Sequence, residues 1–392
     1  MLRLLHTADV HLGARHADLG EAAAAQRERQ FAAFRAAVDL AIEEKVDLFL
    51  VAGDLFDSNV QPKRSVERVA AELGRLATAR IRSVLVPGTH DVYDRSSVYR
   101  AYDLAALAGT RPAEEMVTVL TPDHPWIHLA SVDAVIHGPC FPTKRAPMSP
   151  LRDLAAVETP EAAWRIGLLH ASVAIPGKTD NDEVVVTVEE IAASGLDYLA
   201  LGHWHSAQVA KTKGVTYAYA GAPEPVAVDQ DKAGKVLLVT LDVDGAGQHT
   251  VEVDQRVVGR TTFERREIDA ATIDSQPALI TQLTQGADPD LVLDVRVIGV
   301  RPDGLDLEPG EVEQALRGSF LRVRVRDVSH PALTEGLLPP AETIAGAFIR
   351  NVEGRIADLE ASGDDPARRE ADELRDVLRL GRLLLAGSEV TL

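Results

Sequence analysis

The sequence contains a single cysteine, Cys140, among its 392 residues. One cysteine excludes an internal disulfide framework and fits a reducing cytoplasm, and we interpret Cys140 as a small buried hydrophobic residue. No apolar run approaches the roughly 18 residues needed to span a bilayer. The N-terminal apolar residues are soon interrupted by His6 and Asp9, so we expect neither a signal peptide nor a membrane anchor. We therefore expect a cytoplasmic protein.

Basic residues are scarce: 41 Lys and Arg stand against 60 Asp and Glu, for a formal net charge of −19. Such a surface repels polyanions at long range, which argues against a general nucleic-acid coat protein. The negative net charge does not exclude an enzyme that binds a phosphate group through metal ions and one local strip of basic residues. The sequence also has no Gly-x-Gly-x-x-Gly fingerprint and no P-loop, so no nucleotide cofactor site competes with a metal site.

The length favours two or more domains, and 46% hydrophobic residues are ample for a core. Short apolar runs alternate with helical patterns in the first two-thirds of the chain, which predicts an α/β fold with parallel, doubly covered sheet. Strands are expected at 2–9, 46–54, 81–88, 126–140, 164–172, 196–205, 215–222 and 235–243, and helices at 21–45 and 65–79.

The pattern changes near residue 260. Residues 261–330 have the order β-α-β-α-β, which indicates a small second domain. Two helical patterns follow, joined by the turn sequence SGDDP. We therefore expect three parts, 1–258, 259–332 and a helical hairpin over 338–392.

Five short motifs, each at the end of an apolar run, offer imidazole or carboxylate side chains. They are Asp9 and His11 in DVHLG, Asp54 and Asp57 in GDLFD, His90 in GTHD, His170 in GLLHAS, and His203 and His205 in GHWH. Each motif alone is weak, because a single histidine after a strand is more often a satisfied polar residue than a ligand. Together they are specific, since the carboxyl ends of strands in an open α/β sheet form a common crevice.

Mixed imidazole and carboxylate ligands suit manganese, iron or zinc and fit calcium poorly. A carboxylate that bridges can hold two metal ions about 3.5–4 Å apart, the geometry that clamps both oxygens of a phosphoryl transfer. The motifs therefore predict a centre with two divalent metal ions, for which we favour manganese, with iron and zinc as alternatives.

The order of these motifs resembles that of the calcineurin-like metallophosphoesterases. Within that family, HTADVHLG (6–13), GDLFD (53–57) and YAGAPE (219–224) are most similar to the SbcD-type DNA-repair nucleases and their YhaO-like relatives. The resemblance covers about residues 1–250. It implies a two-sheet sandwich flanked by helices, with the β-α-β-α-β unit as a small α/β cap domain and a C-terminal helical hairpin.

The resemblance also assigns roles. It implies that His90 contacts the phosphate and protonates the leaving oxygen, and that Asp57 orients His90. It implies metal ligands at Asp9, His11 and His205 for the first ion, Asp54 as the bridge, and His170 and His203 for the second ion.

Thr89 departs from the family, which has an asparagine before the catalytic histidine as a ligand of the second metal. One interpretation is that threonine is simply tolerated in the tight turn after Gly88. The other is a weaker or selectively filled second metal site, with slower or altered catalysis.

Three functions remain open. The first is a DNA nuclease subunit, exonuclease or endonuclease, of an SbcCD-like complex, which binds an SbcC-like ATPase through helices within 341–386 and forms a homodimer through 21–45 or 95–109. The second is a phosphodiesterase or phosphatase for a small molecule, which the acidic charge favours slightly. The third is a weakly active scaffold, for which Thr89 is the only support.

Overall fold

The computed structural model describes residues 1–111, 114–179, 182–227, 230, 232–302, 304–331, 339–362 and 365–385. The chain divides into two compact units, Met1–Thr262 and Phe263–Leu392. Residues 338, 363–364 and 386–392 of the predicted hairpin lie outside the described residues. The expected three-part division stays a prediction.

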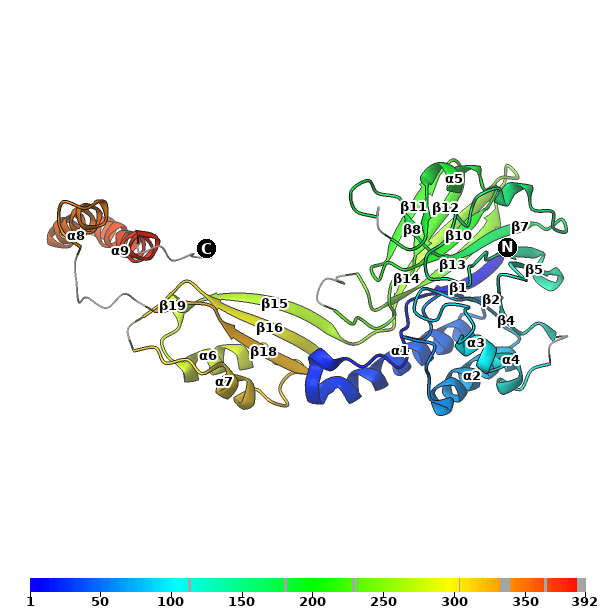
Figure 1. Cartoon of the computed structure of the whole chain (residues 1–392), viewed down its shortest axis with the longest axis horizontal. Helices are drawn as coiled ribbons and strands as arrows, with labels where there is room; N and C mark the ends of the chain where they lie inside the picture. The colour runs from blue at the N-terminus through cyan, green and yellow to red at the C-terminus, as the bar shows by residue number, and fades with distance from the viewer. Residues whose placement is uncertain are drawn as a thin grey trace. The chain divides into compact units, whose positions relative to one another are not determined.

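The first unit contains two six-stranded sheets (Figure 1). In the first sheet, β1 to β4 are parallel and β13 and β14 extend the edge beside β1 in antiparallel pairing. Its strands, in spatial order, are β14 (His249–Val257), β13 (Lys235–Val243), β1 (Leu2–Thr7), β2 (Leu48–Ala52), β3 (Arg82–Val86) and β4 (Val117–Val119).

The second sheet has a parallel centre of four strands and one antiparallel strand at each edge. In spatial order the strands are β11 (Gln208–Thr212), β12 (Val215–Tyr219), β10 (Tyr198–Gly202), β7 (Trp164–His170), β6 (Ala134–His137) and β5 (Trp126–Leu129). A further short pair joins β8 (Ser172–Val173) to β9 (Val185–Val186).

Alternation along the central strands decides which layer each side chain joins. Leu48 and Leu50 of β2 pack with Ile166 and Tyr198 of the second sheet, whereas Phe49 lies in the layer formed with the helices. Because successive side chains of a strand point to opposite faces, a continuous apolar run fills both layers. Burying one such leucine contributes about 1.5–3 kcal/mol.

Helices cover the outer face of each sheet. Ala-rich α1 (Ala23–Glu43) and amphipathic α2 (Lys63–Thr78) cover the first sheet, close to the predicted 21–45 and 65–79, and α5 (Val188–Ala193) packs on the second. The shorter helices of this unit are η1 (Ala17–Ala22), α3 (Val98–Ala101), α4 (Leu104–Leu107), η3 (Ala130–Val132) and η4 (Leu154–Ala156). The predicted two-sheet sandwich flanked by helices is confirmed. Each sheet is covered on both faces, as expected, by helices on its outer face and by the other sheet on its inner face.

The second unit begins with the predicted β-α-β-α-β order. Its elements are β15 (Thr262–Asp269), η5 (Ala270–Thr272), α6 (Gln276–Thr284), β16 (Leu291–Ile298), β17 (Val300–Arg301), α7 (Pro309–Ala315), β18 (Arg322–Asp327) and β19 (His330–Pro331). The three longer strands form one sheet in the order β15-β16-β18, with β16 and β18 parallel. Alternate burial along β16 places Leu293, Val295 and Val297 in a core with both helices.

The C-terminal helices α8 (Ile344–Ser362) and α9 (Asp365–Leu385) pack on one another. Val352 and Ile356 of α8 contact the α9 face that carries Ala371 and Leu374, at the helical spacing seen in the sequence. Among the residues that the structure describes, no helix combines the length and the apolar content that crossing a membrane requires.

A buried histidine lies between the two sheets. His6 of β1 is fully buried, and its Nδ1 lies 2.9 Å from the hydroxyl oxygen of Tyr198. Burial lowers the pKa of His6 to about 3, against the opposing effect of its hydrogen bond with the Leu201 backbone. His6 is therefore neutral in the folded protein at neutral pH.

This burial predicts acid sensitivity. The folded pKa of His6 lies below the unfolded value, so its stabilisation is complete above about pH 6.5 and is lost as the pH falls toward 3, by about 1.4 kcal/mol per pH unit. We expect His6→Gln, which keeps a polar side chain and removes the titration, to lose about 2 kcal/mol less unfolding free energy between pH 7 and pH 5 than the wild type. Urea denaturation at both pH values measures this, and equal losses would contradict it.

Candidate metal centre

All five motifs follow the carboxyl ends of neighbouring strands. Asp9 and His11 follow β1, Asp54 and Asp57 follow β2, and Thr89 and His90 follow β3, while His170 ends β7 and His203 and His205 follow β10. The backbone joins the first two loops, because Asp9 N–H donates to the Gly53 carbonyl at 3.1 Å and His11 N–H to the Asp54 carbonyl at 3.0 Å. The loops that follow β1 and β2 therefore lie side by side.

The loop backbone is strained where it presents these side chains. Asp9, His11, Asp54 and His203 have φ values of 51°, 50°, 50° and 102°, in the left-handed region that side chains other than glycine seldom adopt. Such strain persists where the surrounding structure imposes it, and it concentrates at functional sites. Gly88 is required for a different reason, since a Cβ there would lie 2.2 Å from Asp54 Oδ1.

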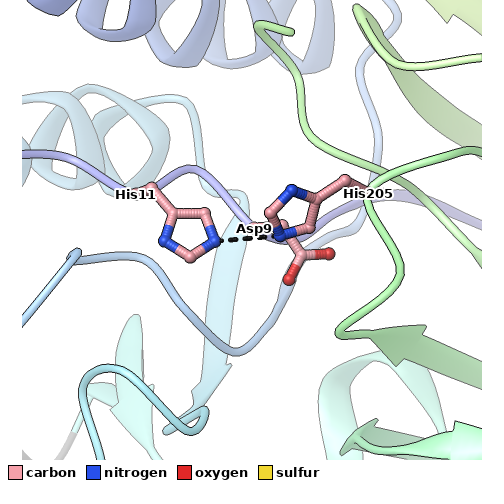
Figure 2. Close-up of side chains that lie close together, drawn as sticks. All are labelled: Asp9, His11 and His205. Carbon is pink, nitrogen blue, oxygen red and sulfur yellow. Dashed lines mark hydrogen bonds between the residues drawn. The ribbon is translucent and has the colours of Figure 1, made fainter. Parts of the chain in front are cut away.

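One cluster joins Asp9, His11 and His205 (Figure 2). Each side chain supplies one ligand atom, and these atoms lie within 4.8 Å of one another. The two imidazoles face each other through their Nε2 atoms at 3.2 Å. Two ring nitrogens and one carboxylate thus converge from loops far apart in the sequence.

A second cluster joins Asp9, Asp54 and His170. His170 Nε2 lies 3.2 Å from Asp54 Oδ2, and its Nδ1 lies 3.0 Å from the Ala52 carbonyl oxygen. Asp54 Oδ2 is also 3.8 Å from His11 Nε2, and the other oxygen of Asp54 accepts the His90 backbone N–H at 2.7 Å. Asp54 thus faces donors of both clusters, the position that a bridging carboxylate needs, and Asp9 belongs to both.

His90 and Asp57 form a third cluster with His11. His90 Nδ1 lies 3.0 Å from the Asp57 carbonyl oxygen but 3.8 Å from its carboxylate, which lies closer to His11 Nδ1 at 3.4 Å. The backbone of Asp57 therefore holds His90, whereas its side chain faces His11. The His90 side chain is 48% exposed, so its ring borders solvent.

His203 and Thr89 lie beside these clusters. Among the residues that the structure describes, His203 is in none of the groups of His, Cys, Asp and Glu that could hold a metal ion. The His203 N–H donates to the Asp9 carboxylate at 3.0 Å, and its ring packs edge-on against His170 at 5.3 Å between centroids. Thr89 is buried and lines, with His170 and Cys140, a cavity of about 20 Å³.

The electrostatics couple these groups. Burial alone would raise the pKa of Asp54, but His170 and His11 hold it well below its usual range. Burial opposes protonation of His170, yet Asp54 and Asp9 raise its pKa to about 10. Burial lowers the pKa of His205. An imidazole this close to carboxylates, such as His170, binds its proton tightly when no metal ion takes its place, so metal ions and protons compete for the site.

A family model described as Calcineurin-like phosphoesterase matches residues 2–207, which include the five motifs with imidazole and carboxylate side chains. The chain belongs to the calcineurin-like phosphoesterase family. The resemblance of the motif order is thereby confirmed, and the family implies divalent metal ions.

Several relatives of this phosphoesterase carry a DNA-repair name, and another is named as an uncharacterized metallophosphoesterase. It is 28% identical to the DNA double-strand break repair protein Mre11 of Aeropyrum pernix, over 65% of this chain and 62% of the relative. It is 25% identical to Mre11 of Methanosarcina mazei, over 95% of this chain and 54% of the relative. It is 26% identical to the uncharacterized metallophosphoesterase YhaO of Bacillus subtilis, over 56% of this chain and 52% of the relative. The aligned part thus spans about half to three-fifths of each relative's length.

The residues present fit such metal ions. His170 Nε2 is buried without a hydrogen-bond partner among the described residues, and it points toward Asp54. The Nε2 atoms of His11 and His205 also face each other. A cation can bind both nitrogens at once, whereas a proton placed between them is bonded to only one. Imidazole nitrogens and carboxylate oxygens are the donors that manganese, iron and zinc accept.

Asp91 was not singled out from the sequence, although it is the last residue of the GTHD motif. Asp91 is fully buried and accepts the N–H of Gly88 at 2.7 Å, the N–H of Phe56 at 3.1 Å and the Tyr99 hydroxyl at 2.6 Å. Burial and the nearby Asp54 raise its pKa. Asp91 ties the GTHD loop of this phosphoesterase to its GDLFD loop, and its place beside His90 was the only sequence signal.

Proposed function

We propose that the chain is a metal-dependent phosphodiesterase that cleaves DNA with two divalent metal ions, manganese first among the candidates. The convergence of side chains from all five motifs in three overlapping clusters carries this proposal. The relatives named for DNA double-strand break repair support the DNA substrate. The single cysteine supports a cytoplasmic location.

Six side chains would hold the ions. Asp9, His11 and His205 would hold the first, His170 and His203 the second, and Asp54 both. The ions, when bound, supply Lewis-acid stabilisation of the phosphoryl oxygens and an activated water.

His90 would protonate the leaving oxygen. Its Nδ1–H donates to the Asp57 carbonyl, so the proton given to the leaving oxygen would be the one that Nε2 carries in the imidazolium form. The Asp57 carboxylate, nearer to His11, would orient that ligand instead of His90.

The activity test uses the purified chain with Mn²⁺ and linear double-stranded or single-stranded DNA. We expect cleavage that stops when EDTA removes the metal and resumes when excess Mn²⁺ is added, because the proposed mechanism depends on the ions. Bound Mn²⁺ without cleavage of either DNA would refute the nuclease proposal. Following end-labelled and circular DNA separates exonuclease from endonuclease action.

A small-molecule phosphodiester is the second candidate substrate, favoured by the net charge of −19, since DNA binding needs basic surface. Hydrolysis of bis(4-nitrophenyl) phosphate without cleavage of DNA would support it. The scaffold alternative requires a poorly filled centre, so two tightly bound metal ions per purified chain would refute it.

Thr89→Asn is expected to raise the affinity for Mn²⁺ at one of the two sites about 10-fold. Thr89 lines the small cavity beside His170, and the longer amide side chain can bring an oxygen toward the metal that the threonine hydroxyl does not reach. Isothermal titration calorimetry measures the change, and Thr89→Ser, which keeps the hydroxyl, should match the wild type. Equal affinities in all three proteins would show that threonine is innocuous.

The C-terminal helices would bind an SbcC-like ATPase. Val377, Leu384 and Leu385 of α9 are 47%, 59% and 43% exposed, which leaves apolar surface for a partner helix. A homodimer through α1 or the 95–109 segment is part of the same proposal. Sedimentation of the chain alone and with such an ATPase tests both associations.

A further inference from the structure

The ring of His205 has a polar neighbour on the side opposite the metal-ligand cluster. Its Nε2 faces His11 Nε2 at 3.2 Å, whereas its Nδ1 lies 2.6 Å from Nε2 of Gln230. Gln230 belongs to none of the five motifs.

The backbone sets the orientation of the Gln230 amide. The Val226 N–H donates to Gln230 Oε1 at 2.9 Å. Because a backbone N–H can only donate, the oxygen of the amide must face Val226 and the NH₂ group must face His205. The Gln230 backbone makes two hydrogen bonds: its N–H donates to the Ala227 carbonyl at 3.3 Å, and its carbonyl accepts the Ala233 N–H at 3.1 Å.

This orientation selects one tautomer of His205. The NH₂ of Gln230 can only donate, so His205 Nδ1 accepts. A neutral imidazole that accepts at Nδ1 carries its proton on Nε2, the nitrogen that faces the metal-ligand cluster. Ligation through Nε2 needs the other tautomer, with an acceptor beside Nδ1–H. Gln230 supplies that acceptor when its amide turns over and releases the Val226 N–H.

The neighbouring YAGAPE segment holds the backbone of the same histidine. The Ala222 N–H donates to the His205 carbonyl at 2.9 Å. At Gly221, where φ is +74°, a Cβ would lie only 2.6 Å from that carbonyl oxygen. Ala222 therefore holds the backbone of His205, and Gln230 contacts its ring.

We propose that Gln230 is a positioning residue that sets the tautomer of His205 and through it the affinity of the Asp9–His11–His205 cluster for a divalent ion. This inference rests on the metal centre of the proposed function. Groups that orient a ligating histidine typically change metal affinity about 10–100-fold when they are removed.

The test compares the metal-stripped full chain with Gln230→Glu, Gln230→Ala and the control Gln255→Ala, which removes an exposed glutamine of β14. Nitrogen NMR of labelled histidine should find the His205 proton on Nε2 in the wild type and on Nδ1 in Gln230→Glu, because a carboxylate only accepts. Calorimetry with Mn²⁺ should find about 10-fold tighter binding in Gln230→Glu, an affinity between those of wild type and Gln230→Glu in Gln230→Ala, which no longer holds the non-ligating tautomer, and no change in Gln255→Ala.

Both readouts are independent of catalysis. A chain that binds Mn²⁺ but hydrolyses no phosphodiester would refute the proposed function and leave the role of Gln230 standing if the shifts appear. The same His205 tautomer in Gln230→Glu and wild type, Mn²⁺ affinities within about 2-fold across the Gln230 variants, or a wild-type chain that binds no Mn²⁺ would each overturn the inference.

Discussion

Replacing Asp54 with asparagine is expected to lower kcat for phosphodiester hydrolysis at least about 10³-fold, on the order of 4 kcal/mol of transition-state stabilisation. Asp54 Oδ2 lies 3.2 Å from His170 and 3.8 Å from His11, so one carboxylate serves both clusters. Its Oδ1 accepts the His90 N–H, a bond that asparagine can keep. The substitution therefore removes the charge that holds both ions while the loop stays in place.

Metal analysis and steady-state kinetics together check this result. Asp54→Asn should bind less than one Mn²⁺ per chain under conditions in which the wild type binds two. Asp123→Asn, on the exposed turn between β4 and β5, is the matched control and should leave both measurements unchanged. Wild-type activity in Asp54→Asn would contradict the assignment of Asp54 as a metal ligand.

His90→Ala is expected to lower kcat for DNA about 10²–10⁴-fold without loss of bound metal, the usual contribution of a general acid. His90 is half exposed, and its Nδ1 is engaged by the Asp57 carbonyl. Its ring therefore reaches a substrate that a buried ligand could not touch. Measuring both kcat and bound metal distinguishes His90 from the metal ligands, because loss of a ligand lowers kcat and the amount of bound metal together.

The leaving group gives the sharper comparison. A nucleotide leaves as a basic alkoxide and needs a proton, whereas nitrophenolate leaves without one. We therefore expect His90→Ala to retain most of its activity on bis(4-nitrophenyl) phosphate, if that ester is a substrate, and His124→Ala, on an exposed turn, to match the wild type on both. Equal losses on the two substrates would contradict proton donation, and loss of bound Mn²⁺ would make His90 a ligand of the cluster with His11 and Asp57.

Local pattern predicted much of the fold. Helix α2 lies within two residues of its predicted start because Val66, Val69, Ala70 and Leu73 recur at the helical period. The apolar run over 46–54 similarly marked β2. Periodicity did not reveal which sheet each strand joins. Buried parallel strands such as β10 and β7 all have near-continuous apolar sequences, so the sequence of a strand does not identify its neighbour.

The sequence by itself determined which imidazole and carboxylate side chains are available as metal ligands and that each lies at or after the end of a strand. Residue type and strand ends are local properties of the sequence. From these came the metal chemistry and the resemblance to the phosphoesterase family. Only the tertiary structure decided that Asp57 turns its carboxylate to His11 and its carbonyl to His90, that Asp91 accepts the Gly88 N–H, and that Gln230 contacts the His205 ring. The packing of two sheets brings His11 and His205 together across 194 residues of sequence. Contacts between such distant loops depend on backbone direction and burial, which no short motif encodes.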